Sequence, residues 1–405
     1  MRRSSPWLVL VIVLLGVLIV REPRLQQLDD VFLSWCMQNS APQLPPAQVT
    51  LVEIGRDDFR QMTPPELKKP LAQGEAARRS LSPLEYALFI QAVLDFEPAV
   101  IGFEPIVIWR DRDKGQEQVF IDQAMRVPKL LVAMELGEKG PRDLAAEDVP
   151  SFSQVTGPRG GLAEFSGVSH RPDDDIRLIS TPGFINLPAD RSDLIRVPML
   201  FEYRGEIVPS FPLQAIILWL RATPSDVKIE LGSSILLPNG WKIPIRRDGT
   251  TTINPVAAGS VRRLTLNQLL LAAQERESHR PPTINLSDLK DQIVLIRVIG
   301  DPLQPPKIIS AAIATIQSNA YVRRAPWIYD WIVILTAAAL SLFLWQISKA
   351  NLLLSAIALT AGYSLLALGI LAQHRLWLPM FLPLVLLWIL VLVRLFTRGS
   401  VQSAS

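Results

Sequence analysis

Apolar residues gather in four long runs, one near the beginning of the chain and three near its end. The closing runs are Trp331–Ile347, Leu352–Ala372 and Leu376–Val393, and each has about the length that a bilayer core requires. Only short polar separators lie between them, so successive helices would form tight antiparallel hairpins. Helices of a soluble core are the alternative, but three such runs have too little polar surface to be solvated. The pattern predicts one transmembrane helix followed, much later, by three more.

The first apolar run, Trp7–Val20, follows Arg2 and Arg3, which is the order found in a signal peptide. A signal peptide also needs small residues at a cleavage site, whereas this run meets Arg21-Glu22-Pro23-Arg24. We therefore expect an uncleaved anchor.

Charge distribution predicts the topology. Charged residues make up 20% of the chain and its net charge is +3, but the long middle is nearly neutral. A nucleic-acid-binding domain would show a basic face, so we expect no nucleic-acid partner. Lys349 and Arg398 share one side with the N-terminal arginines if four helices span, and the positive-inside rule makes that side the cytoplasm. Arg323 and Arg324 then lie outside, where a long translocated domain is largely exempt from the rule.

These arguments predict a multi-pass membrane protein, in contact with the lipid bilayer and with both termini in the cytoplasm. The expected division is a cytoplasmic N-terminus at 1–6, an anchor helix at 7–21, an extracytoplasmic α/β domain at 22–326, transmembrane helices at 327–347, 352–372 and 376–395, and a cytoplasmic tail at 396–405.

The polar middle alternates between strand and helix patterns. A capping box with proline at the first helical position, Ser82-Pro83-Leu84-Glu85, opens one predicted helix, and a second ends near Met125. They separate short buried strands, an order that implies parallel pairing. The predicted strands are Gln48–Ile54, Ala99–Phe103, Lys129–Met134 and Ile293–Ile296.

A β-hairpin is predicted inside this α/β pattern. Asn239-Gly240 between Ile235–Leu237 and Trp241–Ile245 suits a type I′ turn. The fold class is therefore a mixed, largely parallel α/β sheet with an inserted hairpin, plus four transmembrane helices. Further helices are expected at Phe211–Arg221, Leu266–Glu275 and Ile308–Val322, and irregular chain at Gly55–Ser80 and Gly137–Pro182.

Three charged residues form the main candidate site. Glu53, Glu104 and Arg297 each lie at or near the end of a predicted apolar strand. Ligands of open parallel sheets bind beyond the carboxyl ends of the strands, so these side chains could hold a small polar molecule. A charge in an apolar run must be paired or reach water, and a structural ion pair or solvent exposure are the alternatives.

Other reactive residues predict neither a catalytic nor a metal site. The sole cysteine, Cys36, has no obvious base partner and excludes an intramolecular disulfide. Asp173-Asp174-Asp175 offers oxygen ligands but lacks the spacing of a calcium loop. No Ser/His/Asp set and no nucleotide loop is present. We expect no enzyme, no cofactor and no metal.

Several short motifs together resemble the second class of CHASE domains, the extracellular sensory modules of bacterial cyclases and kinases. The similar segments, in order, are Leu28-Asp29-Asp30 after the first anchor, Val100–Glu104, Gly183–Asn186 continuing to Arg196, Pro209-Ser210-Phe211, Asp248-Gly249 to Ile253-Asn254, Asp291–Ile296 and Trp377-Leu378-Pro379. The resemblance spans residues 27–395 and implies a protein of a bacterial plasma membrane, with a periplasmic α/β sensory domain followed by three helices. It also adds Arg196 to Glu53, Glu104 and Arg297 as a candidate ligand-binding residue.

The chain departs from that family pattern at four places. Gly55 stands where the family has an aspartate, Glu104 replaces another aspartate, and Arg297 replaces a glycine. The family's Trp/Pro-rich element that ends in arginine is replaced by Leu81-Ser82-Pro83-Leu84, which has no arginine. Because only 12 residues follow Val393, we expect no kinase or cyclase output domain. We therefore expect a sensor or interaction module that signals through a separate membrane or cytoplasmic protein. The alternative is a scaffold subunit of a cell-envelope complex.

Overall fold

The computed structural model describes residues 14, 16–17, 28–29, 31–33, 35–37, 44–55, 81–109, 113–138, 149–187, 196–254, 256–299, 308–325, 327–344 and 348–397. The chain forms two compact units. Unit 2 is Gln43–Tyr321, and unit 1 combines Met1–Pro42 with Val322–Ser405. The first predicted transmembrane helix and the expected irregular stretch 55–80 lie almost wholly outside the described residues.

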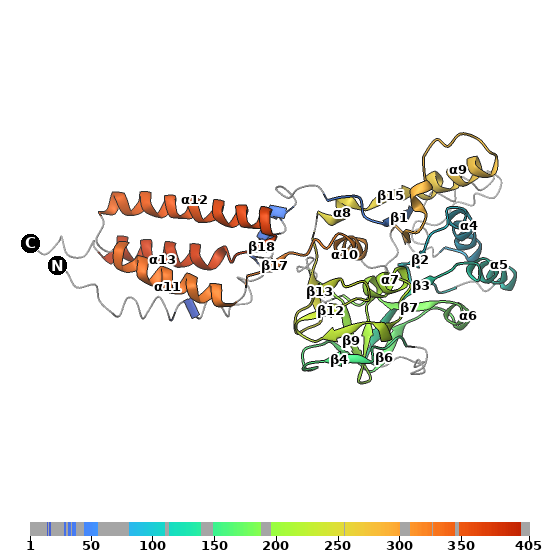
Figure 1. Ribbon diagram of the computed structural model, residues 1–405, viewed down its shortest axis with the longest axis horizontal. Helices are drawn as coiled ribbons and strands as arrows, with labels where there is room; N and C mark the ends of the chain where they lie inside the picture. The colour runs from blue at the N-terminus through green and yellow to red at the C-terminus, as the bar shows by residue number, and fades with distance from the viewer. Residues whose placement is uncertain are drawn as a thin grey trace, which may run out of the picture. The chain divides into compact units, whose positions relative to one another are not determined.

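A seven-stranded sheet forms the centre of unit 2 (Figure 1). Its order is β15-β1-β16-β2-β3-β6, with β7 also pairing with β3. All pairs are parallel except β3 with β6, which confirms the largely parallel sheet that the sequence predicts. The strands are β1 (Val49–Ile54), β2 (Val100–Phe103), β3 (Leu130–Gly137), β6 (Gly167–His170), β7 (Thr181–Phe184), β15 (Arg262–Thr265) and β16 (Ile293–Val298).

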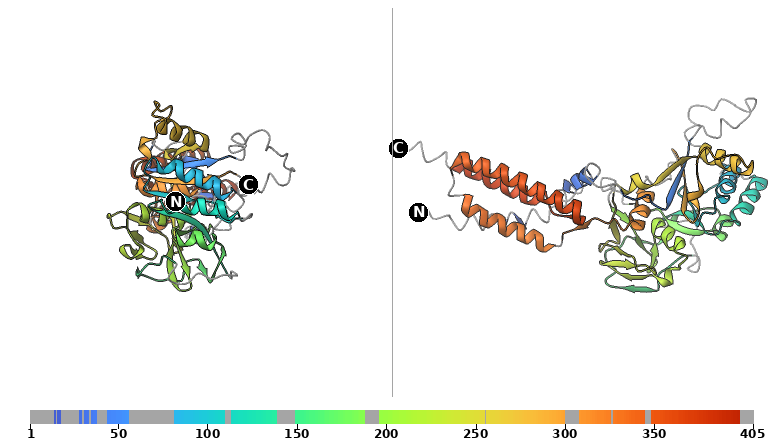
Figure 2. Two further views of the ribbon diagram at one scale, coloured as in Figure 1. Left: turned by 90° about the vertical axis from the view of Figure 1, so that its right-hand side faces the viewer. Right: turned by 45° about the horizontal axis from the view of Figure 1, so that its top comes forward.

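Helices cover both faces of this sheet, because the central strands β1, β2, β3 and β16 are buried at nearly every position. On one face, α4 (Pro83–Leu94), α5 (Lys114–Ala124) and α9 (Leu266–Glu277) pack through residues such as Phe89, Phe120 and Leu269. On the other lie α7 (Phe211–Trp219), α8 (Ala257–Ser260) and α10 (Ile308–Gln317), which pack through residues such as Phe211 and Ile313. Figure 2 shows this layered domain from two further sides.

Local sequence signals place most helix ends correctly. Ser82 and Glu85 form the predicted capping box at the start of α4, with hydrogen bonds of 3.3 and 2.6 Å. The helix expected to reach Val322 ends earlier, at Gln317. Asn319 takes a left-handed conformation (φ 47°) that terminates a helix, and this explains the difference.

Three smaller sheets complete unit 2. They are β10-β9-β5, β13-β12-β11-β4 and β14-β8. Their strands are β4 (Gln154–Thr156), β5 (Glu164–Phe165), β8 (Arg196–Pro198), β9 (Leu200–Tyr203), β10 (Glu206–Pro209), β11 (Lys228–Glu230), β12 (Ser234–Leu236), β13 (Lys242–Pro244) and β14 (Thr250–Thr252). The expectation that 137–182 is irregular was wrong for its described part, which also contains α6 (Asp174–Leu178). Strands β4 and β5 of this stretch are short and pair with the distant strands β11 and β9, so they lack a local period.

The predicted hairpin exists as β12 and β13, but its turn type was wrong. Gly240 N donates to Leu237 O at 2.9 Å, and within Pro238–Gly240 only Gly240 has a positive φ (84°). A type I′ turn needs positive φ at both central residues. Pro238 fixes its own φ near −65° and so selects a type I turn followed by glycine in the left-handed region.

Unit 1 contains three closing helices. These are α11 (Trp327–Leu344), α12 (Lys349–His374) and α13 (Phe381–Thr397). Leu386 of α13 shares one apolar cluster with Ile334 of α11, and Val391 of α13 shares another with Ala356 of α12. The helix expected over 376–395 begins only at Phe381, because Leu376–Trp377 forms strand β18 and Pro379 follows it.

One helical stretch of the described chain, Asn351–Gln373 in α12, is long and apolar enough to span a membrane. The apolar stretches Ile328–Leu340 and Phe381–Val393 are shorter. The layout of four transmembrane helices therefore stays a prediction.

Gly183 allows α7 to lie directly on β7. A Cβ atom there would lie 2.8 Å from Cδ2 and 3.0 Å from Cα of Phe211. We predict that Gly183→Ala destabilises the protein by about 1–3 kcal/mol, the usual cost of overpacking a core. Thermal unfolding of the full chain in detergent, followed by circular dichroism, measures the effect. Gly160→Ala is the control, because no atom lies within 4 Å of its Cβ position; equal melting temperatures for both variants would contradict the prediction.

Candidate functional site

The three charged residues predicted from strand ends lie on neighbouring strands of the central sheet. Glu53 of β1 is in register with Arg297 of β16. Glu104 directly follows β2, whose last residue, Phe103, is in register with Ile296. All three therefore lie at the carboxyl edge of the sheet, where the sequence argument expects them.

The same residues share one face of the sheet. Side chains alternate along a strand, and Glu53, Arg297 and Glu104 follow the parity of Leu51, Leu295 and Val100 respectively. Leu51, Leu295 and Val100 belong to the core beneath α7 and α10. The charged groups thus lie on the α7/α10 side of the sheet.

Glu104 and Arg297 form a buried ion pair. Arg297 Nη1 lies 3.4 Å from Glu104 Oε2. Glu104 is 0% exposed and Arg297 is 8% exposed. Glu53 is half-buried. Burying two charges costs several kcal/mol each, which a close partner offsets. Of the alternatives drawn from the sequence, the structural ion pair applies to Glu104 and Arg297. That these residues bind a ligand stays a prediction.

Helices α7 and α10 both begin near this carboxyl edge. Ser210, the N-cap of α7, bridges to Phe184 at the end of β7. At the other end of α7, Trp219 Nε1 donates to Asp291 O at 2.9 Å, just before β16 begins. Likewise α10 ends where Gln317 Nε2 donates to Gln48 O at 3.1 Å, just before β1 begins. Their first turns therefore lie at the same edge as the ion pair.

The first turn of α7 contains polar atoms without a protein partner. Ser210 and Gln214 are each 2% exposed, and neither Ser210 Oγ nor Gln214 Oε1 has a hydrogen bond. Leaving a buried polar group unsatisfied costs about 1–3 kcal/mol, so such groups usually have a water or a ligand as partner. The sequence analysis named neither as a site residue, although Ser210 lies in the motif Pro209-Ser210-Phe211 and Gln214 is the one polar residue in the apolar helix FPLQAIILW.

Asn186 and Arg196, two residues of the family-like motifs, are not part of the ion pair. Asn186, after β7, accepts from Leu136 N at 2.8 Å and donates to Leu136 O at 2.9 Å, so its amide holds the end of β3. Arg196 begins β8 and pairs in register with Thr252, in a separate two-stranded sheet. The structure therefore does not place Arg196 on a strand of the central sheet with the other three candidates.

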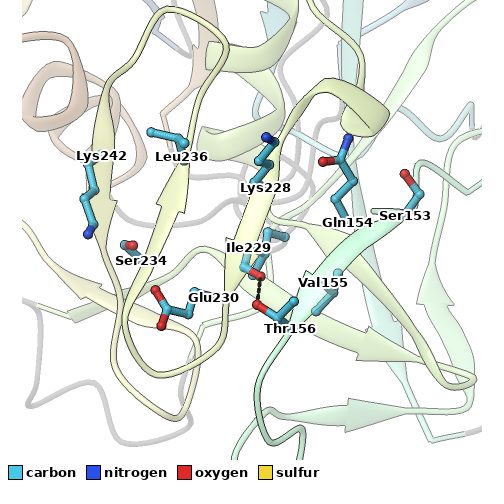
Figure 3. A pocket seen from close by; sticks show the side chains of 10 residues that line it. All are labelled: Ser153, Gln154, Val155, Thr156, Lys228, Ile229, Glu230, Ser234, Leu236 and Lys242. Atoms are coloured by element: carbon cyan, nitrogen blue, oxygen red, sulfur yellow. Dashed lines mark hydrogen bonds between the residues drawn. The ribbon is translucent and has the colours of Figure 1, made fainter.

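A second candidate surface is an open hollow of about 590 Å³ over the sheet β13-β12-β11-β4 (Figure 3). Lys228, Leu236 and Lys242 are aligned in register across three of its strands. Glu230 lies on the same face of β11. Exposed charges of this kind attract an anion only weakly, because water and salt screen them.

The comparison with known families decides the assignment. The family model of the CHASE2 domain matches residues 9–348. The chain belongs to the CHASE2 domain family. CHASE2 domains are extracellular sensory domains of membrane proteins, which confirms the resemblance drawn from the motifs. No curated protein and no solved structure gave a significant match.

The remaining acidic candidates have structural contacts in this CHASE2 domain. Asp173 Oδ2 accepts from Trp109 N at 3.2 Å, and Asp174 pairs with Arg171 at 3.0 Å. Among the described residues, no group of three His, Cys, Asp or Glu side chains is arranged to hold a metal ion.

We predict that Glu104 and Arg297 are energetically coupled in the CHASE2 domain. Arg297→Met removes the guanidinium next to a carboxylate that is 0% exposed, and we expect a loss of about 3–5 kcal/mol. The double variant E104L/R297M should recover most of that loss, because an apolar pair of similar volume often replaces a buried ion pair without cost. Denaturant unfolding of the full chain in detergent measures all three proteins. A double variant no more stable than Arg297→Met would show that the two groups are independent.

Proposed function

We propose that this CHASE2 protein is a membrane-anchored extracytoplasmic sensor that binds a small polar molecule at the carboxyl edge of its central sheet. In this proposal it carries out no chemistry and signals through a separate membrane or cytoplasmic protein. The observation that supports the proposal most strongly is the pair of buried atoms without protein partners, Ser210 Oγ and Gln214 Oε1, at the start of α7.

The chemistry of this edge favours a ligand that donates hydrogen bonds. The Gln214 amide oxygen can only accept a hydrogen bond, whereas the Ser210 hydroxyl can donate or accept. A polar ligand would satisfy both groups and remove the cost of leaving them unpaired. The location agrees with the general rule that open parallel sheets bind ligands beyond the carboxyl ends of their strands.

Signalling would require the ligand to bind two conformations with different affinities. The first turns of α7 and α10 share the edge, and α10 is the last helix of unit 2 before the chain continues to unit 1. Contacts made by a ligand at the edge would therefore act on the helix nearest to the membrane-associated segments in sequence.

The ion pair also supports the second candidate function, a scaffold subunit of an envelope complex. Glu104 and Arg297 already neutralise each other, so they do not require a charged ligand. In that case the domain would serve as a surface for another protein. Purification of the full chain in mild detergent, followed by mass spectrometry, would identify a stoichiometric partner.

The sensor proposal predicts a ligand effect that depends on Gln214. The full chain in nanodiscs of phosphatidylethanolamine and phosphatidylglycerol would be melted with amino acids, polyamines and monosaccharides, each at 1 mM. A compound present at about 100 times its Kd should stabilise the wild type by about 2.7 kcal/mol. Gln214→Leu should abolish this shift without lowering the melting temperature of the free protein, because Oε1 has no hydrogen bond to lose.

Gln274→Leu is the matched control, because this glutamine is exposed on α9. It should respond to the compound as the wild type does. A compound that stabilises the Gln214→Leu and wild-type proteins equally would move the site away from α7. A panel without any effect, together with a stoichiometric partner, would favour the scaffold.

A further inference from the structure

The segment between the predicted anchor and unit 2 is an amphipathic helix in its described residues. Residues 28–29, 31–33 and 35–37 are helical, and we call them the N-terminal segment. Its exposed positions include Leu28, Val31 and Trp35, at 50–58%. Its buried positions follow helical spacing and are Asp29, Leu33, Cys36 and Met37, each at most 3% exposed.

Asp29 binds the loop that precedes the last helix. Its Oδ2 accepts from Trp377 Nε1 at 2.8 Å, and its Oδ1 accepts from Met380 N at 3.1 Å. Hydrogen bonds to a charged acceptor are about twice as strong as neutral ones. A carboxylate that is 3% exposed also depends on such partners, since burial without them is costly.

Aromatic rings reinforce this contact. The ring centroid of Phe32 lies 6.1 Å from that of Trp377 and 6.1 Å from that of Phe381, the latter in an edge-to-face arrangement. Such pairs contribute beyond the area that they bury. The N-terminal segment is therefore fixed to residues 375–381, which we call the receiver loop.

The chain that leaves unit 2 also contacts the receiver loop. Strand β17 (Arg323–Arg324) pairs in parallel with β18 (Leu376–Trp377). Arg323 N donates to Arg375 O and Ala325 N donates to Trp377 O, both at 2.9 Å. Trp377 thus bonds to both segments: its indole donates to Asp29, and its backbone oxygen accepts from Ala325.

The N-terminal segment and the chain from α10 to β17 are the two connections between the units. Where they enter unit 2, they are also joined to each other. The hydrogen bond from Gln317 Nε2 to Gln48 O joins the end of α10 to the residue before β1. The N-terminal segment continues into β1, and α10 continues into β17. The two connections are therefore joined once in unit 2, at Gln48 and Gln317, and once in unit 1, at the receiver loop.

We propose that Asp29 is a positioning residue that clasps the N-terminal segment to Trp377, so that the receiver loop responds to a change in unit 2 and passes it to α13. This inference rests on the proposed sensor function and adds the route by which the membrane helices are reached. A shift of α10 against β1 changes the separation of the two connections. The receiver loop is bonded to the N-terminal segment and to β17. A change in their separation would therefore move this loop and the helix α13 that follows it.

Cys36 provides the readout for a test that needs no ligand. It is the sole cysteine of the chain and is 0% exposed, and burial raises the pKa of its thiol. Its reaction with a maleimide in the full chain, held in nanodiscs, should therefore be slow. We expect Asp29→Ala and Trp377→Phe each to speed the reaction about fivefold or more, since about 1 kcal/mol changes an equilibrium by that factor.

Three further variants keep the proposal falsifiable. The double variant D29A/W377F should react no faster than Asp29→Ala alone, because Asp29→Ala already removes the hydrogen bond that Trp377→Phe removes. Asp29→Asn, which retains one acceptor oxygen, should restore most of the protection. Leu28→Ala, a control at an exposed position of the same segment, should react as the wild type does. Wild-type reactivity of Asp29→Ala, or multiplied effects in the double variant, would overturn the clasp.

Transmission is tested by a change in unit 2. Gln317→Ala removes the hydrogen bond to Gln48 and should alter the reaction rate of Cys36, whereas Gln274→Ala on α9 should not. An unchanged rate in Gln317→Ala, with a fast Asp29→Ala, would show a static clasp and would overturn the transmission. None of these maleimide experiments uses a ligand. Failure of the clasp is therefore distinguishable from failure of the sensor proposal, which the compound panel tests.

Discussion

The position of β16 between β1 and β2 is the constraint on which unit 2 depends. A strand from the end of the domain completes the pairing of its first strand, and Gln317 then joins α10 to the residue before β1. The domain consequently begins and ends at one place. A domain flanked by the predicted membrane helices needs this geometry, because both of its chain connections lead to the same compact unit.

The same topology produces the polar edge. Strands buried on both faces leave room for charged groups only where they end, and Glu53, Glu104 and Arg297 lie there on adjacent strands. Because α7 and α10 start at this edge, buried polar atoms of the sheet and of the helices are concentrated in one region. The fold thus supplies a location for recognition before any particular ligand is considered.

Sequence reasoning identified the four central strands and the main helices because their signals are local. Apolar runs, the capping box at Ser82 and the proline at the start of α4 depend on neighbouring residues alone. The short strands of residues 149–184 and the pairing of β17 with β18 depend on distant partners, so no local period reveals them. The charges at strand ends were found, but the selection of Glu104 and Arg297 as the pair needed the register. Ser210, Gln214 and the bond from Trp377 to Asp29 required the packed structure.

The long sequence separation between β1 and β16 has a consequence for folding during synthesis. As the chain is synthesised, β1 emerges early, but its central neighbour is made only after nearly the whole of unit 2. Until then β1 exposes a hydrogen-bonding edge made of apolar residues, the kind of edge that pairs with other chains. Contacts between such distant segments also slow folding. The newly made domain would therefore depend on holding chaperones, and expression at low temperature and low rate should favour recovery of folded protein.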